Sequence, residues 1–212
     1  MHMLQEITAI AREHFDDAHA SHRWDHTQRV YRLCQHIGEQ EGADMEILKP
    51  AALLHDIARA SEDQAQGSVC HAREGARMAG QILKELNMEE NKIQAIVHCI
   101  DTHRYRDERQ PETLEAQVLF DADKLDSIGA IGVARAFLFA GETGARLHNK
   151  EIDPENTSPY TLEDTAYREF LVKLRWVKDR MVTPTARKMA EDRHHFMESF
   201  FERLNQEYDG LK

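Results

Sequence analysis

The sequence contains few cysteines, and they follow no recognisable pattern. Cys34, Cys70 and Cys99 are an odd number of thiols, and no two of them have the Cys-x-x-Cys spacing of zinc or redox motifs. These features exclude a disulfide framework and a zinc knuckle. We therefore expect reduced thiols that are mostly buried.

Long apolar runs are also absent from the 212 residues, and the mean hydropathy is -0.65. A transmembrane helix needs about 20 consecutive apolar residues, so none is expected. Residues 1–20 mix charged and apolar side chains and contain no apolar core of the kind found in secretory signals. We expect a cytoplasmic protein that makes no contact with membranes.

Basic residues are in deficit, since 27 Lys and Arg stand against 38 Asp and Glu, for a net charge of -11. Broad binding to polymeric nucleic acid or to anionic membranes requires a basic face, so neither is expected. A small phosphorylated substrate is still possible, because a metal ion and a few local cations can bind it. The contents of 41% hydrophobic and 31% charged residues are typical of a globular domain.

Strand-like alternation of useful length is missing as well, and apolar residues recur instead every three to four positions. This pattern predicts an all-α fold, arranged as a single domain over residues 1–212, with a C-terminal helical extension over 158–209 packed on the core. A long helical pattern at 114–140 is softened by Gly129 and Gly132, two residues that favour close helix packing. Polar loops are expected at 60–69, 102–111 and 141–159.

Several helix ends have recognisable signals. Gly42 is expected to end one helix, and Asp44 to cap the next, in which Pro50 marks a kink or a late start. The stretch Thr161-Leu-Glu-Asp164 resembles a capping box, and Thr183-Pro184 combines a cap with proline at the first helical position. In the two helices that follow, we expect a core formed by Trp176, Phe196, Phe200 and Phe201.

What the sequence does have is 13 histidines, one of which forms the doublet His55-Asp56 inside an apolar segment. A helix that is apolar all round is usually buried, and a buried Asp is normally paired or bound to a metal. Adjacent helical residues point about 100° apart, so both side chains can reach a cation that lies between them. The alternative is a hydrogen-bonded core histidine beside a paired Asp.

Two further residues extend the possible ligand set. His26 shares an apolar stripe with Val30, and Asp123 lies in an acidic run in which Asp121 and Asp126 are alternatives. Each of these could instead be a satisfied core histidine or a solvated acid. Together they supply two imidazoles and two carboxylates, a mixture that suits Mn, Fe, Co, Ni or Mg.

The ordered set and its flanks resemble the HD-domain metal-dependent phosphohydrolases. The flanks that carry the resemblance are Trp24-Asp-His-Thr-Gln-Arg-Val30, Ile96-Val-His-Cys-Ile-Asp-Thr-His103 and Ile128-Gly-Ala-Ile-Gly-Val-Ala-Arg135. The resemblance runs over residues 22–141, which we take as the metal-site core, and is greatest to small stand-alone bacterial HD hydrolases, a branch that includes nucleotide pyrophosphohydrolases. It implies one divalent ion held by His26, His55, Asp56 and Asp123.

The resemblance suggests roles for further histidines, and positions close to the metal residues in the sequence suggest roles for three cations. Asp56, His71 and His98 are the candidate catalytic residues, and Arg59, His103, Lys124 and Arg135 are the candidate substrate-binding residues. The alternative for each is a surface position, a helix cap or a salt bridge; Glu74 is equally a general base or a solvated acid. Relatives with two metals use an adjacent pair of histidines, where this chain has His98-Cys99. This departure predicts a single ion. The remaining histidines expected on the surface are His14, His19, His22, His194 and His195.

The function implied by the resemblance is hydrolysis of a nucleotide or another small phosphorylated metabolite, through attack of metal-activated water on phosphorus. The favoured version is a nucleoside triphosphate pyrophosphohydrolase. The alternatives among enzymes are a nucleoside monophosphate phosphatase and a cyclic phosphodiesterase. The alternatives from other classes are a non-catalytic, metal-bound nucleotide sensor and a di-iron oxygenase.

Overall fold

The computed structural model describes residues 2–15, 24–64, 69–104 and 109–212, and their regular structure is helical throughout, without a strand. This confirms the predicted all-α fold. The predictions for His19 and His22 lie outside the described residues. None of the described helices is both long and apolar enough to cross a membrane.

In chain order, the elements are α1 His2–Glu13, α2 Trp24–Glu41, α3 Met45–Leu54, α4 Arg59–Gln64, α5 His71–Glu85, α6 Glu90–Thr102, α7 Leu114–Leu125, α8 Gly129–Glu142, η2 Pro154–Asn156, α9 Ala166–Val172, η3 Leu174–Arg180 and α10 Pro184–Tyr208.

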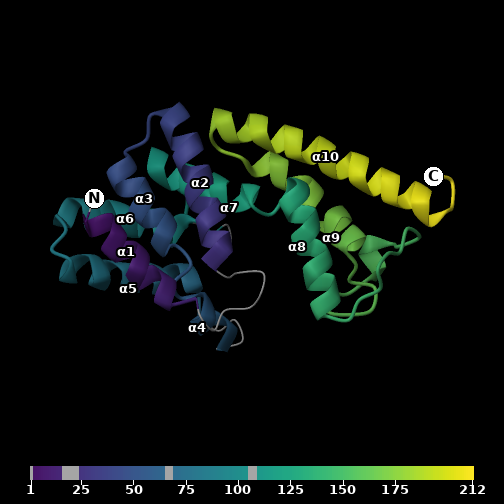
Figure 1. Ribbon diagram of the computed structural model, residues 1–212, viewed down its shortest axis with the longest axis horizontal. Coiled ribbons are helices and arrows are strands. Elements are labelled where there is room, and N and C mark those ends of the chain that lie inside the picture. The colour runs from purple at the N-terminus through teal and green to yellow at the C-terminus, as the bar shows by residue number, and fades with distance from the viewer. Residues whose placement is uncertain (1, 16–23, 65–68, 105–108) are drawn as a thin grey trace. The chain divides into compact units, whose positions relative to one another are not determined.

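The chain divides into two compact units, Met1–Asp123 and Lys124–Lys212, which we call the N-unit and the C-unit. In the N-unit, α3 packs against α1, α2 and α6, and α5 packs against α6 (Figure 1). Residues 51–54 of α3 are all buried, so this short helix forms the centre of the N-unit. The predicted single domain over 1–212, with a metal-site core at 22–141 and an extension at 158–209, stays a prediction.

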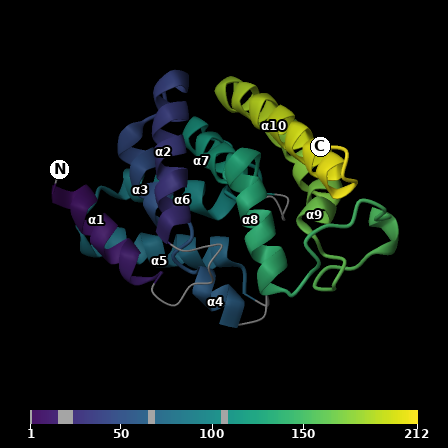
Figure 2. The same ribbon diagram turned by 45° about the vertical axis from the view of Figure 1, so that its right-hand side comes forward.

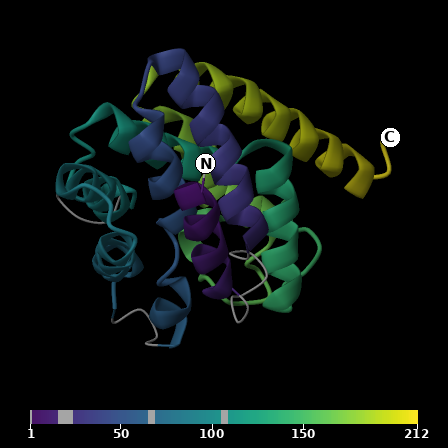
Figure 3. The ribbon, with the colours of Figure 1, turned by 60° about the vertical axis from the view of Figure 1, so that its left-hand side comes forward.

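In the C-unit, α10 packs against α8 and η3, and α9 also contacts both of these elements (Figure 2). Helix α10 has 25 residues and runs without a break (Figure 3). The Phe170 and Phe201 rings stack with their centroids 4.7 Å apart, which forms part of the core. Trp176 and Phe196 were predicted to be core residues, but they are 49% and 48% exposed. Their helical spacing was compatible with either face.

Local signals account for most of the helix ends. Gly42 follows α2 with a φ of +80°, a left-handed conformation that glycine adopts readily. The Asp44 side chain accepts a hydrogen bond from the Glu46 N–H at 2.8 Å and caps α3. Thr183 caps α10, with Pro184 in the first turn. Pro50 lies inside α3, so it does not mark a late start of that helix.

The predicted capping box at Thr161–Asp164 is wrong. Helix α9 begins later, at Ala166, because Thr165 accepts the capping hydrogen bond from the Arg168 N–H at 3.1 Å. Asp164 instead accepts hydrogen bonds from the Tyr160 N–H and from the Arg168 guanidinium, at 2.7 and 2.8 Å. This carboxylate therefore holds the loop that precedes α9.

The long helical pattern at 114–140 is broken between α7 and α8. Gly129 has a φ of +76°, and a Cβ atom there would lie 2.9 Å from the Cγ atom of Arg193 in α10. At Gly132, a Cβ atom would lie 2.2 Å from the carbonyl oxygen of Ser127. Both glycines are thus required by the close approach of other atoms, as their packing role predicted.

The burial of the three cysteines agrees with the prediction, whereas that of the histidine pair in α10 agrees only in part. Cys34 and Cys99 are buried, Cys70 is half-buried, and all three are free thiols, which confirms the prediction of mostly buried, reduced cysteines. His195 is exposed as expected, but His194 is only 8% exposed. The prediction of a surface position for His194 is therefore wrong.

Candidate metal centre

The doublet lies just beyond α3 rather than within a helix. Helix α3 ends at Leu54, and the next four residues form turns, in which the Arg59 N–H donates to the Asp56 carbonyl oxygen at 3.0 Å. Residues 51–58 are all buried, as the apolar neighbours predicted. The turn brings the side chains of His55 and Asp56 to one place, with their nearest ring and carboxylate atoms 3.8 Å apart.

The four predicted metal ligands lie together in the N-unit. The His26 Nε2 atom lies 3.4 Å from Asp123 Oδ1, 3.4 Å from His55 Nε2 and 3.6 Å from Asp56 Oδ2. These side chains come from the first turn of α2, from the turn after α3 and from the last turn of α7. Three of them, His26, His55 and Asp123, have ligand atoms that all lie within 4.8 Å of one another.

The orientation of His55 is fixed by its own backbone. Its Nδ1 donates to the Ala52 carbonyl oxygen at 2.8 Å, which leaves the Nε2 lone pair directed at His26 and Asp56. Burial lowers the pKa of His55 to about 4, although the charge of Asp56 opposes the shift. The imidazole is therefore neutral near pH 7, which is the form that binds a metal.

Asp56 connects this group to a second one. Its Oδ1 atom lies 3.2 Å from His71 Nε2 and 3.6 Å from His103 Nε2, and the three residues form another cluster within 4.8 Å. Burial raises the pKa of Asp56, but the charge of His55 and hydrogen bonds from His103 and His71 outweigh this and hold its pKa well below its usual range. Asp56 is thus a carboxylate with one oxygen toward each group.

A layer of charged residues behind His71 was missed at the sequence level. The His71 Nδ1 atom contacts Glu62 Oε2, and the Arg104 guanidinium donates to the other oxygen of Glu62. Burial raises the pKa of Glu62, but the hydrogen bonds from Arg104 and His71 outweigh it, so the net shift is downward. The predicted residue Arg59 joins this layer, with Nη1 3.4 Å from Glu62 Oε2 and 3.3 Å from His71 Nδ1.

Three predicted residues are not brought into either group. The His98 Nε2 atom accepts a hydrogen bond from the Glu112 N–H at 3.2 Å, so this ring faces the segment just before α7. Lys124 and Arg135 belong to the C-unit, where Arg135 donates to the Asp126 carboxylate at 2.8 Å. Roles for these three residues in catalysis or substrate binding stay predictions.

Asp121 and Asp126, the alternatives to Asp123 as a metal ligand, and Glu74, the suggested general base, lie outside the two groups of possible ligands. Asp126 pairs with Arg135, and Asp121 is buried outside both described groups. Glu74 pairs with Arg77 on the surface of α5, at 2.6 and 3.0 Å, which agrees with the solvated alternative.

The donor set fits a divalent cation. Neutral imidazole nitrogens and carboxylate oxygens are the ligands that borderline and hard divalent ions prefer. His26, His55 and Asp123 would hold such an ion together with Asp56, whose Oδ2 atom lies 3.6 Å from His26 Nε2 and 3.8 Å from His55 Nε2.

The comparisons with known proteins agree with this geometry. The model of the HD domain family matches residues 23–128. The protein YpgQ of Bacillus subtilis is 33% identical over 98% of this chain and 94% of its own length. The chain belongs to the HD-domain family. As an HD-superfamily hydrolase, it is a metal-dependent phosphohydrolase, as the resemblance implied.

Solved structures of relatives extend the likeness to nearly the whole chain. An HD-superfamily hydrolase from Bacillus thuringiensis has a TM-score of 0.78 and 29% identity, covering 98% of this chain and 97% of that one. The structure of B. subtilis YpgQ in complex with ADP has a TM-score of 0.76 and 30% identity, covering 99% and 100%. The fold of this HD-superfamily hydrolase is therefore shared along both units.

Proposed function

We propose that this HD-superfamily hydrolase acts on nucleotides, and that it cleaves nucleoside triphosphates to monophosphate and pyrophosphate. The observation that carries the proposal is the shared position of Asp56 between a metal-ligand group and the His71–His103 pair. The guanidinium groups of Arg59 and Arg104 lie 3.3 and 3.1 Å from His71 Nδ1, and such groups match phosphoryl oxygens well. The ADP bound to YpgQ supports a nucleotide ligand.

The metal-ligand group would hold one divalent ion. When bound, such an ion polarises a phosphoryl oxygen and lowers the pKa of a coordinated water. His26, His55, Asp56 and Asp123 would fix its place, and Asp56 would keep its second oxygen toward His71 and His103. We propose one tightly held ion per chain, measured as metal content by elemental analysis; two ions per chain would assign Asp56, His71 and His103 to a second site.

The remaining side chains would bind and protonate the substrate. His71 would donate a proton from Nε2 to the leaving phosphate oxygen, since its Nδ1 is held by Glu62. His103 donates from Nδ1 to the Ile100 carbonyl oxygen at 2.6 Å, so its Nε2 is oriented toward the same place. Arg59 and Arg104 would neutralise charge on the phosphate chain.

The test is turnover of a nucleotide panel with Mn²⁺, followed by separate assays of pyrophosphate and phosphate. We expect pyrophosphate release from nucleoside triphosphates by the wild-type protein, and a loss of at least about a hundredfold in Asp56→Asn. The matched control is Glu46→Gln, because Glu46 is 73% exposed and pairs with Lys92 on the surface. Phosphate release alone, from monophosphates, would support the phosphatase alternative instead.

A non-catalytic nucleotide sensor is the candidate from another class. It would bind nucleotide with the metal in place and return it unchanged after long incubation.

We propose a cytoplasmic enzyme without a polymeric nucleic-acid substrate, in keeping with its net charge of -11.

A further inference from the structure

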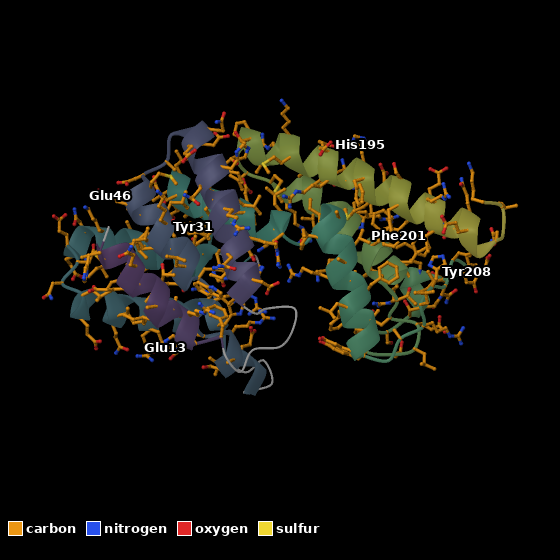
Figure 4. All side chains as sticks on the ribbon, viewed as in Figure 1. Glu13, Tyr31, Glu46, His195, Phe201 and Tyr208 are labelled. Atoms are coloured by element: carbon orange, nitrogen blue, oxygen red, sulfur yellow. The ribbon has the colours of Figure 1, made fainter. Side chains whose placement is uncertain are left out.

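The C-unit contains a cavity that the hydrolytic chemistry does not use. It has a volume of about 510 Å³ and lies among α9, η3 and α10, and all of its lining residues belong to the C-unit. This volume is within the range of pockets that bind small molecules, about 300–1,000 Å³. Its aromatic wall is formed by Tyr167, Phe170 and Phe201, and Figure 4 shows Phe201 on α10.

Two buried polar atoms of lining residues have no hydrogen-bond partner among the residues that the structure describes. They are Nε of Arg175 and Nδ1 of His194, whose residue is only 8% exposed. Next to the cavity, the Nδ1 atom of His148 is also without a partner, while its Nε2 donates to the lining residue Asn205 at 2.8 Å. Buried polar groups are normally paired in folded proteins, so these atoms are candidates for hydrogen bonds to a molecule bound in the cavity.

The two atoms require opposite hydrogen-bonding groups. The His194 Nε2 atom lies 3.3 Å from Glu198 Oε1, so Nε2 carries the proton and Nδ1 is an acceptor in the neutral ring. Arg175 Nε carries a hydrogen and is a donor only. A ligand that satisfies both must therefore present a donor and an acceptor, which is the pattern on the edge of a nucleobase.

The charges at the cavity disfavour a highly anionic ligand. Lys178 is already paired, at 3.5 Å from Asp179 and 3.3 Å from Glu191. Glu198 and Glu202 add two more carboxylates to the lining, which leaves Arg175 as the cation available to a ligand. A polyphosphate would be repelled by this arrangement.

We propose that this cavity binds a neutral heteroaromatic compound of the nucleobase or nucleoside class. The ring would pack against the aromatic wall, accept a hydrogen bond from Arg175 and donate one to His194. The Arg175 guanidinium also lies 4.5 Å from the centre of the Trp176 ring, so binding would change the surroundings of that indole. The inference does not rest on the proposed function, since its residues take no part in the metal centre.

The test uses the fluorescence of Trp176 in a Trp24→Phe protein, because the chain contains only 2 tryptophans. Adenosine and adenine are titrated into the full-length protein with a chelator present. We expect a saturable change with both, or with adenosine alone if the ribose contributes. Arg175→Gln and His194→Phe should weaken the binding at least tenfold, whereas Arg203→Gln should not, since Arg203 pairs with Glu207 outside the cavity.

Ligand variants test the same contacts without changing the protein. Purine riboside, which lacks the exocyclic amine of adenosine, should bind more weakly because it cannot donate to His194. ATP should also bind more weakly than adenosine. Three results would overturn the proposal. One is no saturable fluorescence change up to about 5 mM adenosine, because a dissociation constant above that value is weaker than typical specific binding. The others are tighter binding of ATP than of adenosine, and an unchanged affinity for adenosine in folded Arg175→Gln protein.

Discussion

At the residue scale, the two carboxylate oxygens of Asp56 face different partners. One lies near His26 and the other near His71, so a single side chain lies between the proposed metal ligands and the groups proposed to contact the substrate. The layer formed by Glu62 and Arg104 then orients His71 from behind. Substitutions in that layer should change the orientation of His71 while leaving the proposed metal ligands in place, so they can distinguish an effect on catalysis from an effect on metal binding.

Glu62→Gln should lower kcat by about ten- to a hundredfold while the metal content stays unchanged. The amide of glutamine has the same size as the carboxylate but carries no negative charge to stabilise a protonated His71 ring. Proton donation by His71 should therefore be less effective. The measurements are steady-state kinetics and metal analysis of the purified variant. Glu74→Gln is the control, since Glu74 pairs with Arg77 on the surface. Loss of metal together with activity would place Glu62 in the metal centre instead.

The buried imidazole of His55 predicts a pH dependence of stability for the metal-free protein. Its pKa is about 4 when folded and about 6.5 when unfolded, so between these values only the unfolded chain takes up the proton. The free energy of unfolding should therefore fall as the pH is lowered from about 6.5 to about 4, by on the order of 1–3 kcal/mol from this group.

Urea denaturation at pH 7 and pH 5, with a chelator present, measures this effect. His55→Gln should show a smaller loss between the two pH values than the wild-type protein. The same loss in both proteins would mean that other groups cause it.

At the element scale, the sequence predicted what depends on near neighbours. The caps at Asp44 and Thr183 and the helix end at Gly42 involve residues within a few positions, and the structure confirms them. The box at Thr161 failed because a second threonine, Thr165, competes for the same role four residues later. Both threonines have the pattern of a cap, and the pattern alone does not say that Asp164 pairs with Arg168 inside the helix that Thr165 caps.

The candidate site was predictable to the same extent. The doublet and its two partners have a recognisable order along the chain, and the structure brings them together. The Glu62–Arg104 pair joins residues 42 positions apart, in segments that carry no shared pattern, so only the packed structure reveals it. Exposure of Trp176 was missed for the related reason that periodicity does not say which face is covered.

The break between α7 and α8 predicts a difference between two glycines of α8. Gly129→Ala should lower the free energy of unfolding by about 1–3 kcal/mol, because its φ is +76° and its Cβ would approach Arg193. Gly141→Ala is the matched control, since a Cβ atom there meets no atom of the described part of the chain within 4 Å, and alanine favours a helix. Denaturant melts compare the two, and equal stabilities would contradict the requirement for glycine at 129.

At the scale of the whole molecule, the proposed metal ligands come from three separated segments of the N-unit. An ion bound by them stabilises the folded state alone, by an amount that grows with its concentration. Mn²⁺ should therefore raise the Tm of the wild-type protein, while Asp123→Asn should show little response. Differential scanning fluorimetry with and without a chelator measures this, and an equal rise in the variant would remove Asp123 from the ligand set.

Within the C-unit, the end of α7 contacts the C-terminal helix. Asp123 lies two residues before Leu125, whose carbonyl oxygen accepts a hydrogen bond from Arg193 of α10. Arg193 directly precedes His194, which lines the cavity of the C-unit. Neighbouring residues of α10 thus bind the last turn of α7 and line the cavity. A ligand that stabilises α10 would therefore also stabilise the end of α7 that lies in the C-unit.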